Sequence, residues 1–437
     1  MKIAIIGGGF SGLTLAYFLA KKGLKPTLIE KDKILGGLAS GFEIAPGIWL
    51  EKFYHHWFSN DTDILNLVKE LNLASSIISV NPVTSFYYNR SIFRLSSPKD
   101  LVHFNLLSWG GKLSLFLFTI RARLIKRFDK LENLTALDWL RQTCSEEVVN
   151  KIWKPLLQGK FGTYYDQISA VWLWNKIKLR GSSRDNLQRE LLYYFKGGFQ
   201  SLCEELGHRV ARLGGQILLS DEVVKLDPSP GNPRRIEKIV LRSGTVLECD
   251  AVFLTPSVPI IKNLLPEHFQ EKTQWDIHYL ANRCLVLILK KSLSETYWLN
   301  VADPSFPFVG VIEHTNLDSP SNYGGKHIVY LSKYLPVTDE LFNMPLEEYT
   351  QFSTASLRRM FPEFSETWIE KVFDWRAEYA QPIVTRGYKN KLPPFTLDAS
   401  NVYICTMAQI YPEDRGTNYA VKYAKKVSDL FLERISS

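Results

Sequence analysis

The sequence predicts an α/β protein whose parallel sheet is assembled from well-separated parts of the chain. Three observations predict this fold. The β-branched run at 3–6 stops at a cluster of glycines, a helical pattern and a second strand follow at once, and short apolar strands return at 251–255 and 401–405. Short apolar runs bounded by turns are typical of buried parallel strands. At 437 residues, the chain has room for two or three domains.

The first glycine cluster has the spacing of a dinucleotide-binding turn. Gly7, Gly9 and Gly12 form G-x-G-x-x-G between a strand and a helical pattern at 13–22. The first glycine permits a tight turn, the second lets backbone N–H groups approach a pyrophosphate, and the third lets the helix pack closely on the strand. The second strand, at 26–29, ends at Glu30, which can accept hydrogen bonds from ribose hydroxyls. The sequence therefore predicts a Rossmann-like dinucleotide-binding domain.

Further elements follow from periodicity along the chain. We expect helices at 61–73, from 198 to 213, at 346–360 and at 419–435, where apolar residues recur with the helical period. We expect strands between 77 and 93, at 216–219 and continuing through 221–226, then at 236–241, 245–249, 285–289, 308–312 and 327–331.

A second diglycine, Gly36–Gly37, follows Glu30. This pattern resembles the flavoproteins of the amine oxidase superfamily, in which such a pair lets a loop run close to the flavin. The resemblance implies that the cofactor is FAD. Ile34 and Leu38 stand where that superfamily often carries arginines, so we expect a different charge beside the flavin.

The resemblance covers nearly the whole chain. The segment from 191 to 255 is similar to the middle of protoporphyrinogen oxidases, phytoene desaturases and amine oxidases, and Val223 matches the valine that packs against the adenine. Near 406 the usual Gly-Asp pair is absent, and Thr406–Met407 stands there. The helix that follows is expected to direct its N-terminus at the flavin, where its dipole stabilises negative charge.

The resemblance implies a discontinuous FAD-binding domain with an inserted α+β substrate domain. The FAD-binding domain is expected at residues 1–75, 190–265 and 385–437, and the substrate domain at 76–189 and 266–384. The residues expected to hold the cofactor are Gly7, Gly9, Phe10, Ser11, Gly12, Glu30, Lys31, Gly36, Gly37, Leu38, Val223, Thr255, Arg415, Gly416 and Asn418.

Four residues are candidates for the substrate side of the site. His55 and His56 lie in an aromatic segment that resembles a histidine-containing loop of UDP-galactopyranose mutases, and either could lie over the flavin. Trp375 could wall the flavin and Arg376 could hold an acidic group. Each of the four has a plainer interpretation as a core or surface residue. Adjacent histidines point apart in a strand and no third ligand is evident, so we expect no metal.

Composition and charge restrict the partners. The net charge is +8, yet no nucleic-acid-binding motif accompanies it, so we expect no nucleic acid. Five cysteines without C-x-x-C pairing predict a reduced, cytoplasmic protein without disulfides. Residues 103–127 are apolar and then basic, which is typical either of a helix in a membrane interface or of a buried helix with a solvated end. A peripheral membrane contact and a lipid-like small-molecule substrate remain open expectations.

These features favour an FAD-dependent oxidase, dehydrogenase or desaturase that takes a hydride from an apolar or amphipathic substrate onto flavin N5. Two alternatives stay open. The first is an isomerase similar to UDP-galactopyranose mutase, which the two histidines favour. The second is a flavin-binding protein without turnover, which the missing Gly-Asp pair favours.

Overall fold

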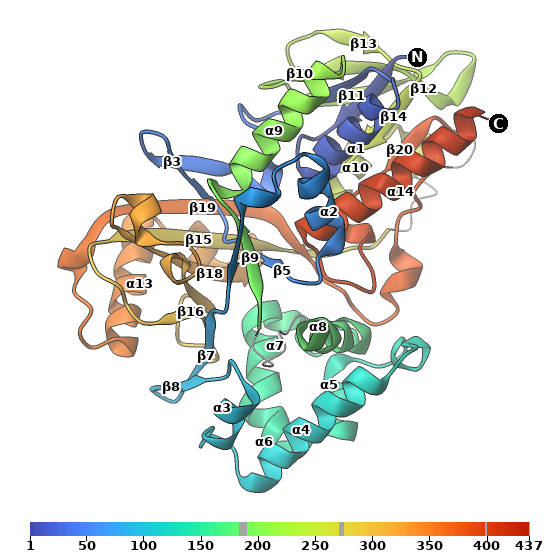
Figure 1. Cartoon of the computed structure of the whole chain (residues 1–437). Coiled ribbons are helices and arrows are strands. Elements are labelled where there is room, and N and C mark those ends of the chain that lie inside the picture. The colour runs from blue at the N-terminus through green and yellow to red at the C-terminus, as the bar shows by residue number, and fades with distance from the viewer. Residues whose placement is uncertain (183–189, 271–274, 398–399, 437) are drawn as a thin grey trace.

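A computed structural model describes residues 1–182, 190–270, 275–397 and 400–436 (Figure 1). Its first sheet has the order β10-β2-β1-β14-β20, with every neighbouring pair parallel. The strands are β1 (Ile3–Ile6), β2 (Pro26–Ile29), β10 (Gln216–Leu218), β14 (Ala251–Leu254) and β20 (Val402–Ile404). This confirms the predicted α/β fold. The five strands come from the three segments expected to form the dinucleotide-binding domain.

Helices cover one face of this sheet and a small sheet covers the other. Helices α1 (Phe10–Lys21), α9 (Gly198–Arg212) and α14 (Thr417–Ser436) lie side by side in Figure 1, and α1 contacts both others. Strands β11 (Val223–Ser229), β12 (Asn232–Leu241) and β13 (Val246–Glu248) form the small antiparallel sheet. Its buried side chains share one core with Ala4 and Ile6 of β1.

The pairing predicted for the strand at 221–226 is wrong. Residues 221–226 were expected to continue the strand at 216–219, but β10 ends at Leu218 and β11 pairs with β12 in a different sheet. The cause is local, because Ser220 adopts a φ of 61° and turns the chain out of the parallel sheet.

A second, larger sheet has the order β19-β15-β18-β17-β16-β7-β8. It contains β7 (Val83–Tyr88), β8 (Ser91–Arg94), β15 (Tyr279–Leu289), β16 (Thr296–Val301), β17 (Gly310–Glu313), β18 (His327–Leu335) and β19 (Ile369–Pro382). Helix α13 (Leu346–Met360) buries Tyr349 and Leu357 against it. Its strands therefore come from the two segments expected to form the substrate domain.

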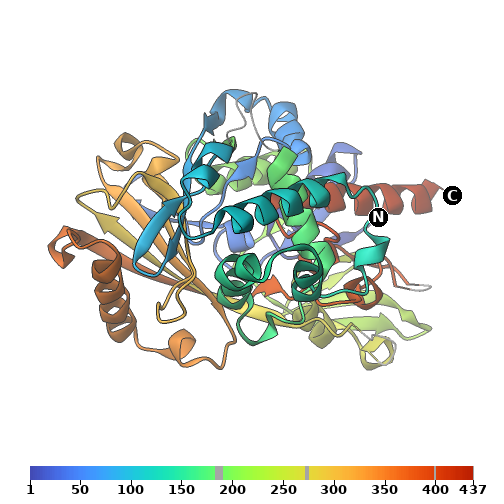
Figure 2. The same cartoon turned by 90° about the horizontal axis from the view of Figure 1, so that it is seen from below.

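A helical layer lies below the large sheet in Figure 1 and nearest the viewer in Figure 2. It comprises α3 (Pro98–Val102), α4 (Trp109–Leu124), α5 (Ala136–Thr143), α6 (Glu146–Val148), α7 (Lys154–Phe161) and α8 (Ala170–Ser182). The ring of Phe118 on α4 packs at a tilt of 57° against that of Trp139 on α5, with ring centroids 4.9 Å apart. Within the described ranges, no helix is both long and apolar enough to cross a membrane.

The remaining described elements connect these layers. They include β3 (Gly41–Ala45), β4 (Ile48–Glu51), β5 (Trp57–Phe58), α2 (Thr62–Glu70), β6 (Ile77–Val80), β9 (Leu192–Phe195), α10 (Val258–Leu264), α11 (Glu267–Gln270) and α12 (Glu340–Asn343). Strand β5 pairs with β9, which places the segment at 53–58 between the two large sheets and above the helical layer (Figure 1).

Candidate cofactor and substrate site

The first glycine turn has a backbone that only glycine can supply. Gly7 has a φ of 101°, and a Cβ atom on Gly12 would lie 1.9 Å from the Gly7 carbonyl oxygen. Helix α1 starts directly after Gly9, which provides no side-chain cap. The N–H groups of the first helical turn, including those of Phe10 and Ser11, therefore donate no hydrogen bond to a capping side chain, which leaves them available to a phosphate.

Glu30 lies beside this turn at the end of β2. Its side chain is only 7% exposed, and it accepts hydrogen bonds from the N–H groups of Gly8 at 2.5 Å and Asp32 at 2.9 Å. Burial raises its pKa, against the lowering effect of these two bonds. The carboxyl group is thus held next to the glycine turn, while Lys31 is exposed.

The second diglycine lies against the first. The Gly36 N–H donates to the Gly8 carbonyl at 2.8 Å, and Gly36 forms a parallel bridge with Gly9. Gly36 and Gly37 both have positive φ, and a Cβ on Gly37 would lie 3.2 Å from the Gly9 Cα. The backbones of the two glycine segments therefore face one another without intervening side chains, beside the N-terminus of α1 and the buried Glu30. This arrangement fits the diphosphate and ribose of FAD.

Two more predicted cofactor residues lie close to the same turn. The Thr255 hydroxyl donates to the Ile6 carbonyl at 2.8 Å, directly against Gly7. Val223 is buried where β11 begins, and the nearby Asp221 N–H donates to the Glu30 carbonyl at 3.2 Å. The start of β11 therefore reaches the acid at the end of β2.

The segment before α14 and the first turn of that helix carry three more predicted cofactor residues. Arg415 donates to the Tyr334 hydroxyl at 2.6 Å and to Gln381 Oε1 at 3.1 Å. Gly416 follows, and the Asn418 side chain accepts from the Ile64 N–H at 3.0 Å. Arg415 is thus fixed by strands β18 and β19 of the large sheet, while Asn418 ties the start of α14 to α2.

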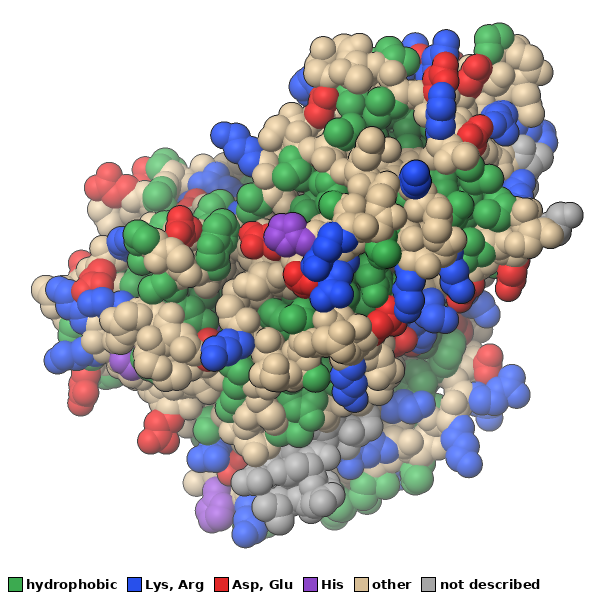
Figure 3. Space-filling model, turned by 45° about the horizontal axis from the view of Figure 1, so that its top comes forward, with side chains coloured by type: hydrophobic (Ala, Val, Ile, Leu, Met, Phe, Trp, Pro, Cys, Tyr) green, Lys and Arg blue, Asp and Glu red, His purple; other side chains and the backbone are tan. Residues whose placement is uncertain are grey.

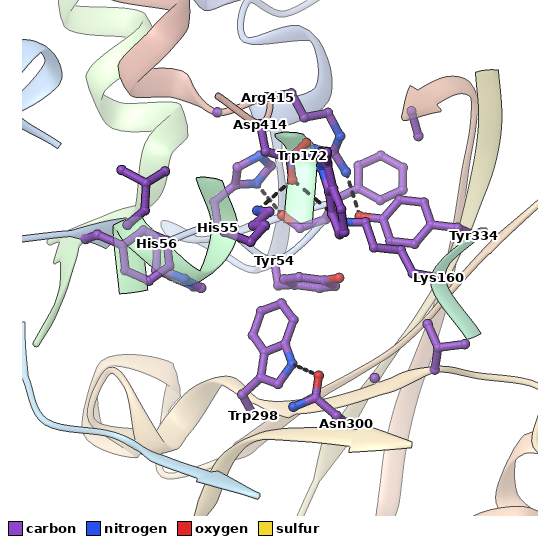
Figure 4. A pocket seen from close by; sticks show the side chains of 18 of the residues that line it. Tyr54, His55, His56, Lys160, Trp172, Trp298, Asn300, Tyr334, Asp414 and Arg415 are labelled. Carbon is purple, nitrogen blue, oxygen red and sulfur yellow. Dashed lines mark hydrogen bonds and ion pairs between the residues drawn. The ribbon is translucent and has the colours of Figure 1, made fainter. Parts of the chain in front are cut away.

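A cavity of about 400 Å³ brings several of these residues together (Figure 4). On one side it is lined by Leu38, His55, His56 and residues 414–419. On the other side it is lined mostly by apolar side chains of the helical layer and the large sheet, among them Trp153, Leu156, Leu157, Trp172, Leu173, Ile177, Trp298, Val301 and Val309. Predicted cofactor residues and a largely apolar wall therefore share one space.

Charged groups cluster at one end of this cavity. Asp414 is 7% exposed, and its Oδ2 lies 2.6 Å from the Lys176 Nζ and 3.7 Å from the Lys160 Nζ. Burial opposes ionisation of Asp414, but Lys176, Lys160 and Arg415 outweigh it and hold its pKa far below the usual range. Lys160 also lies 5.4 Å from the centre of the Tyr334 ring. The cluster carries three cations and one carboxylate.

His55 enters the cavity as a neutral imidazole. Its Nδ1 lies 2.6 Å from the Phe53 carbonyl oxygen, which can only accept, so Nδ1 carries the proton and Nε2 is the acceptor. Burial lowers the pKa of His55 to about 4, against the raising effect of the bond to Phe53, and the positive charge of Arg415 lowers it further. His56 instead bonds through Nδ1 to the Tyr297 hydroxyl at 2.9 Å.

This pKa predicts a pH-dependent stability. Between pH 6.5 and about 4 the unfolded chain binds a proton at residue 55 that the folded chain refuses, so the free energy of unfolding falls as the pH is lowered through this window. His55→Gln keeps a polar amide side chain at this position but cannot titrate, so we expect the free energy of unfolding to fall less steeply with pH. Urea unfolding at a series of pH values measures how steeply the free energy of unfolding depends on pH. His103→Gln is the matched control, because His103 makes the same kind of bond to the Lys99 carbonyl but is exposed. Equal slopes for His55→Gln and the unsubstituted protein would contradict the prediction.

Two predicted substrate-side residues do not line this cavity. Trp375 packs its ring 4.8 Å from Phe42, beneath the ammonium group of Lys52. Arg376 forms an ion pair with Asp374 at 3.0 Å. The structure therefore brings His55 and His56 together with Leu38 and Arg415, and leaves Trp375 and Arg376 apart from them.

Sequence reasoning did not single out several side chains of the cavity. They are Trp172, Lys176, Asn300, Tyr334 and Asp414. Trp172 and Lys176 lie one turn apart on α8, the others lie on β16, on β18 and in the loop before α14, and no local motif marks them. Among the described residues, no three His, Cys, Asp or Glu side chains are grouped as metal ligands would be.

Comparison with known proteins gives a match to one family model and to curated relatives. The model of the family described as flavin containing amine oxidoreductase matches residues 10–413. The 15-cis-phytoene desaturase of Oncidium hybrid cultivar is 26% identical over 289 residues, covering 62% of this chain and 49% of the relative. A mitochondrial protoporphyrinogen oxidase of Nicotiana tabacum is 25% identical over 254 residues, covering 50% of each.

The chain thus spans about half the length of the curated relatives it matches. Among solved structures, reduced UDP-galactopyranose mutase superposes with a TM-score of 0.75 at 14% identity, covering 99% of this chain and 95% of that one. At this identity the likeness is one of fold.

Proposed function

Because the chain belongs to the family of flavin-containing amine oxidoreductases, we propose that it is an FAD-dependent oxidoreductase that takes a hydride from an apolar or amphipathic small molecule. When bound, FAD supplies the hydride acceptor, flavin N5. The observation that carries the proposal is the shared cavity, in which Leu38 and residues 415–418 meet an apolar wall. A space of about 400 Å³ accommodates a small-molecule substrate.

The apolar wall supports the substrate class. Trp153, Leu157, Trp172 and Trp298 offer large rings and aliphatic side chains, which bind extended hydrocarbon or ring systems and exclude water. Two relatives are named phytoene desaturase and protoporphyrinogen oxidase, and a polyene or a tetrapyrrole would suit such a wall. We include both classes among the candidate substrates.

The opposite end of the cavity supports an amphipathic substrate. Lys160, Lys176 and Arg415 line that end together with Asp414 and Asp61, so a carboxylate or phosphate on the substrate would find three cationic groups there. The buried indole N–H groups of Trp153 and Trp172 have no hydrogen-bond partner among the described residues, and both side chains line the cavity. These donors favour a substrate that carries an acceptor oxygen.

His55 contributes a neutral acceptor to the same space. Since its Nδ1 is committed to Phe53 and burial keeps the ring neutral, its Nε2 can accept a hydrogen bond at neutral pH. In this proposal His55 orients the substrate, and hydride removal needs no side-chain base.

Anaerobic absorption spectroscopy of the FAD-loaded protein tests the function. Isoprenoid, porphyrinogen, amine and nucleotide-sugar candidates are added in turn, and we expect one apolar or amphipathic class to bleach the flavin. Conversion of a nucleotide sugar only after prior flavin reduction, without net electron transfer, would favour the isomerase instead. A folded, flavin-loaded protein that no candidate reduces would leave the non-catalytic alternative.

Filling the cavity is expected to separate substrate binding from cofactor binding. Ile177 lines the cavity from α8 and is partly exposed, so Ile177→Trp adds bulk at the cavity wall without loss of a fully buried side chain. We expect flavin content and reduction by dithionite to stay unchanged, while substrate-driven flavin reduction slows at least tenfold. Lys178→Trp, at the exposed neighbouring position, is the matched control. Equal reduction rates for Ile177→Trp and Lys178→Trp would place the substrate elsewhere.

A further inference from the structure

Helix α4 exposes an unusual number of large apolar side chains. Six of its residues are strongly exposed, namely Trp109 (72%), Leu113 (58%), Phe116 (51%), Leu117 (42%), Ile120 (38%) and Leu124 (72%). Figure 2 shows α4 on the outer side of the helical layer. Burial of such side chains is normally favourable, so a contiguous exposed group marks an interaction surface.

These six side chains form one stripe. At about 100° per residue they all fall within a sector of roughly 100° around the helix axis. The opposite side of α4 is packed, with Gly111, Phe118 and Ala122 buried. The stripe is therefore the outward face of a helix already anchored in the fold, and it is about 24 Å long. We call it the α4 stripe.

Basic side chains border the α4 stripe on both edges. Arg121 lies about 40° beyond one edge and Arg123 about 20° beyond the other, by the same helical projection. Lys126 and Arg127 follow the helix and are exposed. Residues 101–128 contain no Asp or Glu. On the view in Figure 3, by contrast, Lys and Arg side chains are scattered over the surface among acidic ones.

From this arrangement we propose that α4 docks on the surface of a bilayer that contains anionic lipids. The α4 stripe enters the headgroup and upper acyl region, and Arg121, Arg123 and Lys126 contact lipid phosphates. The helix lies along the interface, in keeping with the absence of a membrane-crossing helix within the described ranges. A second copy of the chain is a poorer occupant, because two α4 helices face to face would bring only positive charges together.

This proposal goes beyond the proposed function and does not depend on it. The test is flotation of the FAD-loaded full chain with vesicles, using flavin absorbance to follow the protein. One set of vesicles is pure phosphatidylcholine and the other is an equal mixture with phosphatidylglycerol. We expect binding to the anionic vesicles, weakened by salt, and much weaker binding to the neutral ones.

Three variants identify the surface that binds. Phe116→Ser is expected to weaken binding roughly tenfold, as loss of a large buried side chain does. Replacement of both Arg121 and Arg123 with Gln is expected to weaken it roughly fivefold per arginine. Phe352→Ser on α13 removes an apolar side chain of similar exposure, 38%, far along the chain from α4, and is expected to leave binding unchanged.

Several outcomes would overturn the proposal. They are no flotation with anionic vesicles, equal binding by Phe116→Ser and Phe352→Ser, or a lipid-free dimer that Phe116→Ser dissociates. Because flotation needs no substrate, a failure to float would not contradict the oxidoreductase proposal. Equally, failure of every substrate to reduce the flavin would not contradict membrane docking by α4.

Discussion

Gly12→Ala is expected to yield a chain that no longer retains FAD. The new Cβ would lie 1.9 Å from the carbonyl oxygen of Gly7, far inside any tolerated contact, and the neighbouring atom is backbone that cannot swing aside. Either α1 must move away from β1 or the turn at Gly7 must open. A misplacement of about 1 Å in a preorganised site lowers a reaction rate on the order of 100-fold, and we expect a loss of FAD affinity of at least that order.

Flavin absorbance per protein after desalting measures this loss, and circular dichroism reports whether the chain still folds. Gly231→Ala is the matched control, since a Cβ there meets nothing within 4 Å and no positive φ is required. If Gly12→Ala kept a full complement of flavin, the assignment of this turn to the FAD diphosphate would be wrong.

Asp414→Asn is expected to destabilise the fold by about 1–3 kcal/mol, because it removes the buried carboxylate that the partly exposed Lys176 and Lys160 share. The direction in which this stabilisation changes with pH follows from the lowered pKa of Asp414. Its stabilising contribution is fully present above the unfolded value near 3.9 and is lost as the pH falls below it. The difference between Asp414→Asn and the unsubstituted protein should therefore shrink in acid.

Urea unfolding at neutral and acidic pH measures both effects. Asp429→Asn is the control, because Asp429 pairs with Lys425 at 3.3 Å on the exposed surface, where such a pair contributes about 0–1 kcal/mol. Combining Asp414→Asn with Lys176→Met should destabilise less than the sum of the two single changes. Additive losses would show that Asp414 and Lys176 are not coupled.

The cofactor side of the molecule was largely predictable from sequence, because its chemistry is local. The spacing of Gly7, Gly9 and Gly12 dictates one backbone turn, and the acid at position 30 follows from the length of one strand–helix–strand unit. The approach of Gly36 to Gly9 spans only a short stretch of chain. Such short-range features leave a readable pattern in the sequence.

The substrate side was much less predictable, because it depends on tertiary packing. Lys160, Lys176, Tyr334 and Asp414 meet from four distant segments, and none carries a motif. Trp375 and Arg376 were expected at the site, but on β19 it is Ala380 that lines the cavity and Gln381 that donates to Asp414. At about 3.3 Å per residue, Trp375 lies roughly 16 Å earlier along the same strand.

The segmented parallel sheet also governs when the protein can acquire its cofactor during synthesis. Strand β1 is flanked by β2, made almost immediately, and by β14, made about 250 residues later, while β20 needs about 150 residues more. At roughly 5–20 residues per second, a ribosome takes about 20–80 s to supply that outer strand. Until then the parallel sheet next to the glycine turn lacks its last strand, so we expect FAD to bind only late in synthesis. We also expect cells short of flavin to accumulate aggregation-prone chains.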